Sequence, residues 1–150
     1  MKIVVASDCH GDFESIKKIH LLIQDANYYR FLGDSELDSS LLSPFISVKG
    51  NNDFFLNYPT YKNVTIQNVR FHLEHGTTLN KYNIEERVKS SQCDVFLFGH
   101  THRKFVQKYN DILILNPGST SLPRDGKNGS FLLITFNSKE DLKYEFISLQ

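Results

Sequence analysis

Two short motifs each pair side chains of the kind that bind transition metals. Asp8 and His10 stand two residues apart, and so do His100 and His102. In extended backbone, residues i and i+2 point to the same side, so each motif would present two ligands together. A carboxylate beside an imidazole, or two imidazoles, suit Mn, Zn, Fe or Ni better than Mg or Ca. Each motif alone also fits an ordinary loop, with the aspartate capping the next helix and the histidines solvated.

Three further polar motifs contain side chains that could join such a site. They are Gly33-Asp34, His75-Gly76 and Gly50-Asn51-Asn52-Asp53. Singly, each is typical of a turn, because Gly, Asn and Asp tolerate tight backbone conformations. In a metal site, an Asn oxygen would serve as a neutral ligand that limits the negative charge of the ligand set.

All five motifs directly follow segments that we expect to be strands. Helical spacing predicts helices over residues 13–24, 37–42 and 84–90, and apolar or alternating runs predict strands over 2–6, 28–32, 45–49, 64–67, 69–74, 94–98, 104–109, 112–115, 131–136 and 143–148. The early alternation of strand and helix predicts a parallel sheet, and the many late strands predict a second, mixed or antiparallel sheet. Ligands of α/β sheets bind where strands end, so the motifs have a geometric reason to converge.

The composition is typical of a folded domain in which positive and negative charges balance. The chain has 150 residues, and 17 Lys plus Arg balance 17 Asp plus Glu, so we expect a single domain over residues 1–150. A net charge of zero argues against a coat for nucleic acid or a membrane surface. No apolar run reaches transmembrane length, and the N-terminal run is too short for a signal peptide. Cys9 and Cys93 form no CxxC motif, and we expect a cytoplasmic protein.

In this order, the five motifs resemble the signature of the calcineurin-like metallophosphoesterases, which reads DxH, GD, GN(H/C)(D/E), H and GHxH. Asn116-Pro117-Gly118-Ser119 and Pro123-Arg124 look like the closing segment of the small YfcE-like phosphodiesterase subfamily. The resemblance implies an α/β fold, namely a four-layer α/β/β/α sandwich of two mixed sheets with helices outside. It also implies two divalent metal ions, with Mn²⁺ expected and Zn²⁺, Fe²⁺ or Ni²⁺ as alternatives.

The resemblance assigns four ligands to each metal: Asp8, His10, Asp34 and His102 to the first, and Asp34, Asn51, His75 and His100 to the second. Asp34 would therefore bridge the two ions. Asp34, Asn51 and His75 would form the catalytic centre, where a hydroxide activated by both metals attacks phosphorus.

Phosphate contacts and the source of the leaving-group proton are less completely specified. Asn51, Asn52, Ser119 and Arg124 are candidate phosphate contacts, with a loop corner at Ser119 and a solvated charged turn at Arg124 as alternatives. Asn52 stands where many members of the family have the histidine taken to protonate the leaving oxygen, and Thr77 stands where many have a second histidine. An amide cannot act as a general acid, which is typically worth about 10²–10⁴ in rate. We therefore expect weak turnover, or substrates with good leaving groups.

Three other residues of reactive type are interpreted as structural. His72 lies three residues before His75 on a predicted strand and so faces the opposite side. His20 lies near the apolar stripe of the first helix, and Cys9 should point away from the metals into the core.

The leading hypothesis is a metal-dependent phosphodiesterase that hydrolyses a small phosphodiester. A second hypothesis is a metal-binding scaffold with little catalysis, because the vacuolar-sorting retromer has a subunit of this fold that works as a binding surface. A third is a nuclease or cyclic-nucleotide esterase. The neutral charge argues against an extended nucleic acid as partner, but not against a small nucleotide.

Overall fold

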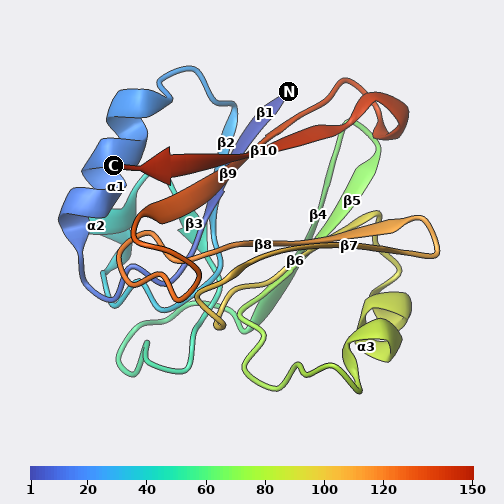
Figure 1. The fold of residues 1–150 in the computed structure, drawn as a ribbon, viewed down its shortest axis with the longest axis horizontal. Helices are drawn as coiled ribbons and strands as arrows, with labels where there is room; N and C mark the ends of the chain where they lie inside the picture. Colours follow the sequence, from blue (N-terminus) through green and yellow to red (C-terminus); the bar gives the residue numbers. More distant parts are fainter.

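Two five-stranded sheets form the centre of the computed structural model, which describes all 150 residues (Figure 1). The first sheet has the order β10-β9-β1-β2-β3, and its strands are β1 (Lys2–Ala6), β2 (Tyr28–Phe31), β3 (Ile46–Ser47), β9 (Gly129–Thr135) and β10 (Lys143–Leu149). The second has the order β4-β5-β6-β8-β7, and its strands are β4 (Tyr61–Ile66), β5 (Val69–Glu74), β6 (Val95–Leu97), β7 (Lys104–Tyr109) and β8 (Ile112–Pro117). Both sheets mix parallel and antiparallel pairs.

Side-chain alternation along the strands builds the layers. In β1, Ile3 and Val5 enter the core between the sheets, where they meet Phe71 of the second sheet, whereas Val4 enters a core under the helices. The helices α1 (Phe13–Leu22) and α2 (Ser39–Leu42) cover the outer face of the first sheet. On the far side, α3 (Ile84–Ser91) covers the second sheet through Val88 (Figure 1). The expected four-layer α/β/β/α sandwich is confirmed.

The strand partners differ from the expectation in one important respect. The late strands do not all belong to the second sheet, because β9 pairs antiparallel with β1 and β10 pairs with β9. The final strands therefore return to the first sheet, and a short 3-10 turn, η1 (Lys139–Asp141), connects them. The third strand is also shorter than the predicted 45–49. Both differences concern pairing between distant segments, which local periodicity does not report.

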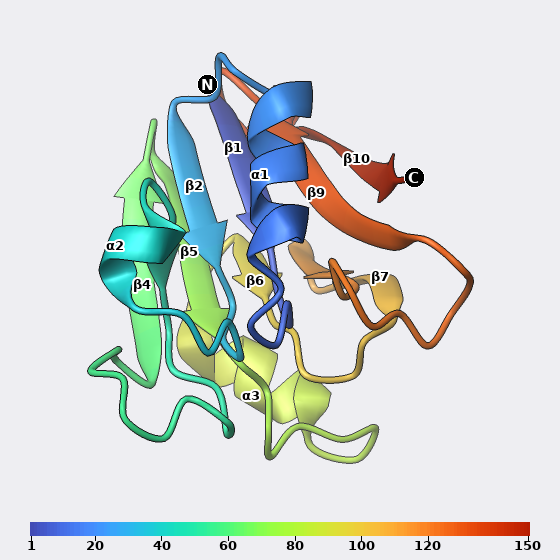
Figure 2. The ribbon, with the colours of Figure 1, turned by 90° about the vertical axis from the view of Figure 1, so that its left-hand side faces the viewer.

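The ends of several strands place the polar motifs together. In Figure 2, the arrowheads of β1, β2 and β5 point toward the same end of the molecule. The parallel pairs β1–β2, β2–β3, β5–β6 and β6–β8 account for this common direction within each sheet. None of the helices combines the length and the apolar character that crossing a membrane requires.

Candidate metal centre

The loops after β1, β2, β5 and β6 bring six of the seven predicted metal ligands into one cluster. The Nε2 atom of His75 lies 3.3 Å from Oδ2 of Asp34 and 3.7 Å from Oδ1 of Asp8. The Nε2 atom of His10 lies 3.8 Å from both of these carboxylate oxygens. His100 joins through Nδ1, which lies 3.3 Å from Nε2 of His75. The sixth member is His102, whose Nε2 atom lies 3.4 Å from Oδ1 of Asp8.

Asp8 is fully buried at the centre of this cluster, yet one of its oxygens has no hydrogen-bond partner. Its Oδ2 atom accepts hydrogen bonds from the Ser7 hydroxyl and from the backbone N–H of His100. Its Oδ1 atom accepts none and lies 3.4 Å from Nε2 of His102. A buried carboxylate oxygen without a donor is costly unless a cation neutralises it.

Hydrogen bonds at the opposite ring nitrogen orient three of the histidines. The Nδ1–H of His10 donates to Oε2 of Glu36 at 2.7 Å, and His75 and His102 donate from Nδ1 to backbone carbonyls at 2.7 and 2.8 Å. Each Nε2 is thereby free to present a lone pair to the cluster. The Nε2 atoms of His10 and His102 lie only 3.2 Å apart, so two lone pairs face one another. Such an arrangement needs a cation, or a proton, between the rings.

The carboxylates make the cluster favourable for positive charge. The nearby Asp8 carboxylate raises the pKa of His102. Burial alone would lower the pKa of His75, but the nearby carboxylates of Asp34 and Asp8 outweigh burial and raise it. The two carboxylates therefore favour positive charge at His75 and His102, whereas burial and the neighbouring His75 lower the pKa of His100.

Asp34 is kept ionised by donors from the loop after β3. Burial alone would raise its pKa, but the nearby His75 ring and the hydrogen bonds from Asn52 hold it well below its usual range. Asn52 donates its backbone N–H to Oδ1 at 2.8 Å and its side-chain Nδ2–H to Oδ2 at 3.0 Å. Asn52 is thus a support for a carboxylate ligand, a role that its sequence position did not suggest.

Asp53 is a second supporting residue that the sequence analysis left without a role. This buried carboxylate accepts backbone N–H groups from Asp34, Gly50 and Glu36 at 2.7–2.9 Å. It therefore ties the loop after β2 to the loop after β3. Its place beside the Gly50-Asn51-Asn52 turn was the available signal.

The backbone of the ligands corrects one step of the sequence reasoning. Extended backbone would explain the shared direction of the i and i+2 pairs, but Asp8, His10, His100 and His102 all have φ between 46° and 73°, in the left-handed region. Asp34, at φ 57°, does as well. Non-glycine residues rarely adopt this conformation, and it occurs preferentially at functional sites where surrounding contacts enforce it.

Two motif glycines allow the loops to approach closely. A Cβ atom at Gly50 would overlap Oδ1 and the backbone nitrogen of Asp34, and a Cβ at Gly99 would overlap Oγ of Ser7. Because these two positions have no side chain, the neighbouring loops can approach each other closely. This close approach lets carboxylates from neighbouring loops reach one cluster.

The remaining predicted site residues lie around the cluster with other contacts. Asn51 is exposed beside His75, so its role as a ligand stays a prediction. Ser119 is fully buried and donates its hydroxyl to the Asp8 carbonyl at 2.7 Å. Arg124 is exposed, and its backbone N–H donates to the His102 carbonyl at 2.9 Å. The closing segment thus braces two of the loops, and the phosphate contacts of Ser119 and Arg124 stay predictions.

The three residues interpreted as structural lie outside the cluster. Cys9 is fully buried in the core under α1, where burial raises the pKa of its thiol to about 12. His72 is buried, stacked on Phe96, and lies 3.0 Å from Oε1 of Glu74. His20, in the last turn of α1, packs against the rings of Tyr29 and Phe45, and burial lowers its pKa. The interpretation of Cys9 as a packing residue is confirmed.

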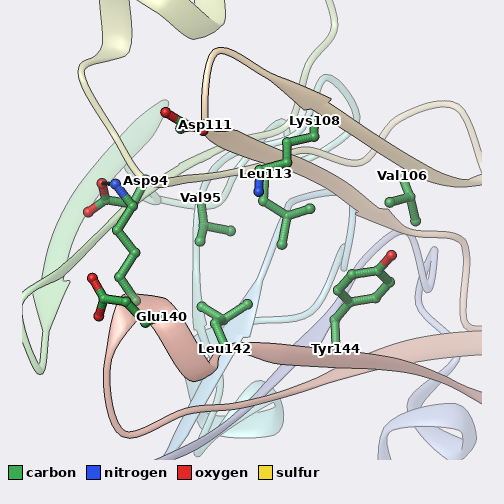
Figure 3. Close-up of a pocket in the computed structure, with 10 residues that line it drawn as sticks. Asp94, Val95, Val106, Lys108, Asp111, Leu113, Glu140, Leu142 and Tyr144 are labelled. Atoms are coloured by element: carbon green, nitrogen blue, oxygen red, sulfur yellow. Dashed lines mark ion pairs between the residues drawn. The ribbon is translucent and has the colours of Figure 1, made fainter.

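Two pockets differ in their relation to the cluster. A groove of about 600 Å³ lies between β7, β8 and β10, with Val106, Leu113 and Tyr144 on its walls (Figure 3). At its edge, Asp94 pairs with Lys139 at 3.2 Å. This groove contains no predicted ligand. A second pocket, of about 410 Å³, includes His75 and therefore opens beside the metal ligands.

Comparison with known proteins agrees with this geometry. The family model of the calcineurin-like phosphoesterase superfamily domain matches residues 1–139. The chain belongs to the calcineurin-like phosphoesterase superfamily. Among its members, "Probable metallophosphoesterase YsnB" of Bacillus subtilis (strain 168) is 31% identical, over 92% of this chain and 86% of that protein. "Phosphodiesterase YfcE" of Escherichia coli (strain K12) is 27% identical, over 87% and 85% of the two chains.

Solved structures share the whole fold. A crystal structure from Streptococcus pneumoniae TIGR4, described as a predicted phosphoesterase, has a TM-score of 0.85 and 27% identity, over 98% of this chain and 88% of that one. Vps29 of Chaetomium thermophilum has a TM-score of 0.78 at 19% identity, over 99% and 96% of the two chains. At this low identity, the likeness to Vps29 shows the fold alone.

Proposed function

We propose that this calcineurin-like phosphoesterase is a phosphodiesterase that uses two divalent cations. The observation that carries the proposal is the buried Oδ1 of Asp8, which has no hydrogen-bond partner and faces the Nε2 atoms of His75, His10 and His102. This donor set of carboxylate and imidazole fits a transition metal, and we retain Mn²⁺ as the expected ion. The name of the E. coli relative supports a diester as substrate.

Two overlapping groups of residues, which share Asp8, could each hold a cation. One comprises Asp8, His10 and His102, and the other Asp8, Asp34 and His75. Asp34 Oδ2 lies within 3.8 Å of His10 Nε2 and 3.3 Å of His75 Nε2, which supports its proposed role as a bridge between the groups. Bound there, two divalent cations would neutralise phosphate oxygens and lower the pKa of water near phosphorus.

The chain's own residues orient the candidate ligands, but Asn52 offers no general acid for the leaving group. Hydrolysis joins the oxygen of water to phosphorus and breaks one ester P–O bond, and the departing oxygen must take a proton from solvent or leave as an anion. Asn52 supplies no proton, because an amide has no usable acidity and its Nδ2–H is directed to Asp34. We therefore expect the enzyme to favour diesters with good leaving groups.

A matched pair of variants tests this function. Wild-type protein with Mn²⁺ should hydrolyse bis(p-nitrophenyl) phosphate and lose this activity in EDTA. Asp34→Asn and His100→Ala should each lower kcat at least a hundredfold. Asp111→Asn is the control, because Asp111 is an exposed turn residue that also has positive φ. Unchanged rates in both site variants would show that the proposed centre is wrong.

The same assay addresses the scaffold alternative. A protein that binds Mn²⁺ but hydrolyses no mono- or diester would be a metal-binding scaffold. A cytoplasmic location also stays a prediction; it rests on Cys9 and Cys93, which are both buried and unpaired.

A further inference from the structure

A polar pocket of about 410 Å³ opens directly beside the metal ligands and has no role in the function proposed above. Its wall includes His75 and Asn51, so any occupant would lie against the metal centre. Lys49 and Arg87 contribute two cationic side chains from different parts of the chain. The pocket exceeds the size of a single phosphate group and lies within the range of small-molecule sites.

The charges of this pocket do not cancel. Glu74 is its only carboxylate, and this side chain pairs with Arg87, with Nη1 2.8 Å from Oε2. Lys49 forms no ion pair and is partly buried. One positive charge is therefore uncompensated beside a reaction centre that handles anions, which favours an anionic group in the pocket.

Hydrogen bonds to Thr78 and Glu74 hold the Arg87 side chain in place. Its Nη2 donates to Thr78 Oγ1 at 2.8 Å, while Nη1 donates to Glu74. Glu74 is nearly buried, and its other oxygen lies 3.0 Å from Nε2 of His72, which is stacked on Phe96. These two hydrogen bonds use two of the five guanidinium N–H donors, so three remain. A positioned guanidinium with free donors matches the geometry of phosphate.

The rim of the pocket offers room for the group that carries such a phosphate. Tyr61 is 59% exposed, and one face of its ring is stacked on His72 at a centroid distance of 5.9 Å. The exposed hydroxyls of Thr60 and Thr77 line the same pocket. A ring-sized organic group therefore finds an aromatic surface and hydroxyl donors in the same pocket as the cations and His75.

We propose that this pocket binds a second phosphate on the substrate, so that the preferred substrates are phosphodiesters that carry an additional phosphomonoester on one ester arm. The inference rests on the proposed phosphodiesterase function. Lys49 and Arg87 bind the second phosphate and thereby place the scissile diester beside His75. Substrates without this phosphate lose that contact and are bound less well.

The test compares two substrates that differ only in the second phosphate. They are the p-nitrophenyl ester of thymidine 5′-phosphate and the same compound phosphorylated on the 3′-oxygen. In Mn²⁺, wild-type kcat/KM should be at least tenfold higher for the 3′-phosphorylated substrate. That ratio should fall close to one in Arg87→Gln and in Lys49→Gln. Lys89→Gln, which removes an exposed charge from the same helix as Arg87, should keep the wild-type ratio.

The outcomes separate this inference from the function on which it rests. Lys49→Gln covers the case in which Arg87→Gln fails to fold, because the Lys49 side chain forms no ion pair. Equal kcat/KM values for the two substrates in wild type, or a ratio that survives both substitutions, would overturn the inference while leaving the phosphodiesterase intact.

If neither substrate is hydrolysed, the proposed function fails, and binding tests the pocket independently. Thymidine 3′-phosphate is titrated by calorimetry into the protein in EDTA. The Kd should rise at least fivefold in Lys49→Gln and stay unchanged in Lys89→Gln. Absence of binding to wild type, or equal binding to both variants, would overturn the inference.

Discussion

Asp8 Oδ1 lies 3.4 Å from His102 Nε2, and no hydrogen bond reaches that oxygen. The two residues come from loops after β1 and β6, in different sheets, and both have left-handed backbone, with φ of 58° and 61°. Both residues therefore have an uncommon backbone conformation, and in this arrangement an imidazole nitrogen faces a buried carboxylate oxygen. A cation bound between them would satisfy the oxygen that no hydrogen bond reaches.

Removal of the Asp8 charge should abolish stabilisation by metal. At a Mn²⁺ concentration 100 times its Kd, one bound ion stabilises the folded state by about 2.7 kcal/mol, which raises Tm by roughly 5–10 °C at this chain length. Asp8→Asn should lose this rise, as measured by differential scanning fluorimetry with Mn²⁺ and with EDTA. Asp111→Asn should keep it. A full shift in Asp8→Asn would show that the ion binds elsewhere.

The Glu36 carboxylate should tune the affinity of the same site. Glu36 accepts the Nδ1–H of His10 at 2.7 Å and so fixes the ring with Nε2 toward the cluster. Glu36→Gln keeps the shape but weakens this contact, and loss of such a partner typically costs about 10–100-fold in metal affinity. Calorimetric titration with Mn²⁺ measures the change, with exposed Glu85→Gln as the control. An unchanged Kd would limit Glu36 to a surface contact.

Gly50 should tolerate no side chain. A Cβ there would overlap the backbone nitrogen and carboxylate of Asp34, so the two loops must separate. We expect Gly50→Ala to lower the free energy of unfolding by about 1–3 kcal/mol and to weaken Mn²⁺ binding. Urea denaturation and the metal titration measure the two effects. A variant of wild-type stability and affinity would contradict the close approach of these loops.

The rate should depend steeply on the leaving group. Asn52 stands beside Asp34 without any proton to give, and a general acid is typically worth about 10²–10⁴ in rate for poor leaving groups. A series of aryl phosphodiesters should therefore show kcat/KM falling sharply as the pKa of the phenol rises. A shallow dependence would reveal an acid outside the residues named here.

Asp94 should make stability depend on acid pH. Its hydrogen bonds from Arg70, with support from Lys139, lower the pKa of Asp94 from 3.8 to about 2. A lowered pKa stabilises the fold above the unfolded value, and this contribution disappears as pH falls through the folded value. Wild type should exceed Asp94→Asn by about 1–2 kcal/mol at pH 5–7, with the difference vanishing between pH 4 and 2.

Urea denaturation across this pH range measures the Asp94 effect. Asp111→Asn is again the control, since Asp111 is exposed and forms no ion pair. A difference that persists at pH 2 would assign the effect of Asp94→Asn to packing.

Local patterns were sufficient for most of the elements, and the polar motifs at the strand ends marked six of the candidate ligands that the structure brings together. The strands predicted over 69–74 and 104–109 have the same bounds in the structure, because the order of apolar and polar residues in each segment is typical of a strand. The third strand shrank to Ile46–Ser47, and the last two strands joined the first sheet. Those results depend on pairing partners far away in the chain.

The sequence by itself determined which side chains could hold metal and that each follows a strand, because residue type and periodicity are local properties. Only the tertiary structure decided that Asn52 and Asp53 support the site, that Glu36 orients His10, and that Arg87 reaches the same pocket as His75. Those relationships arise where loops from two sheets meet. The left-handed backbone at Asp8 follows from the same cause, because contacts across the sandwich, and not neighbours in the chain, enforce it.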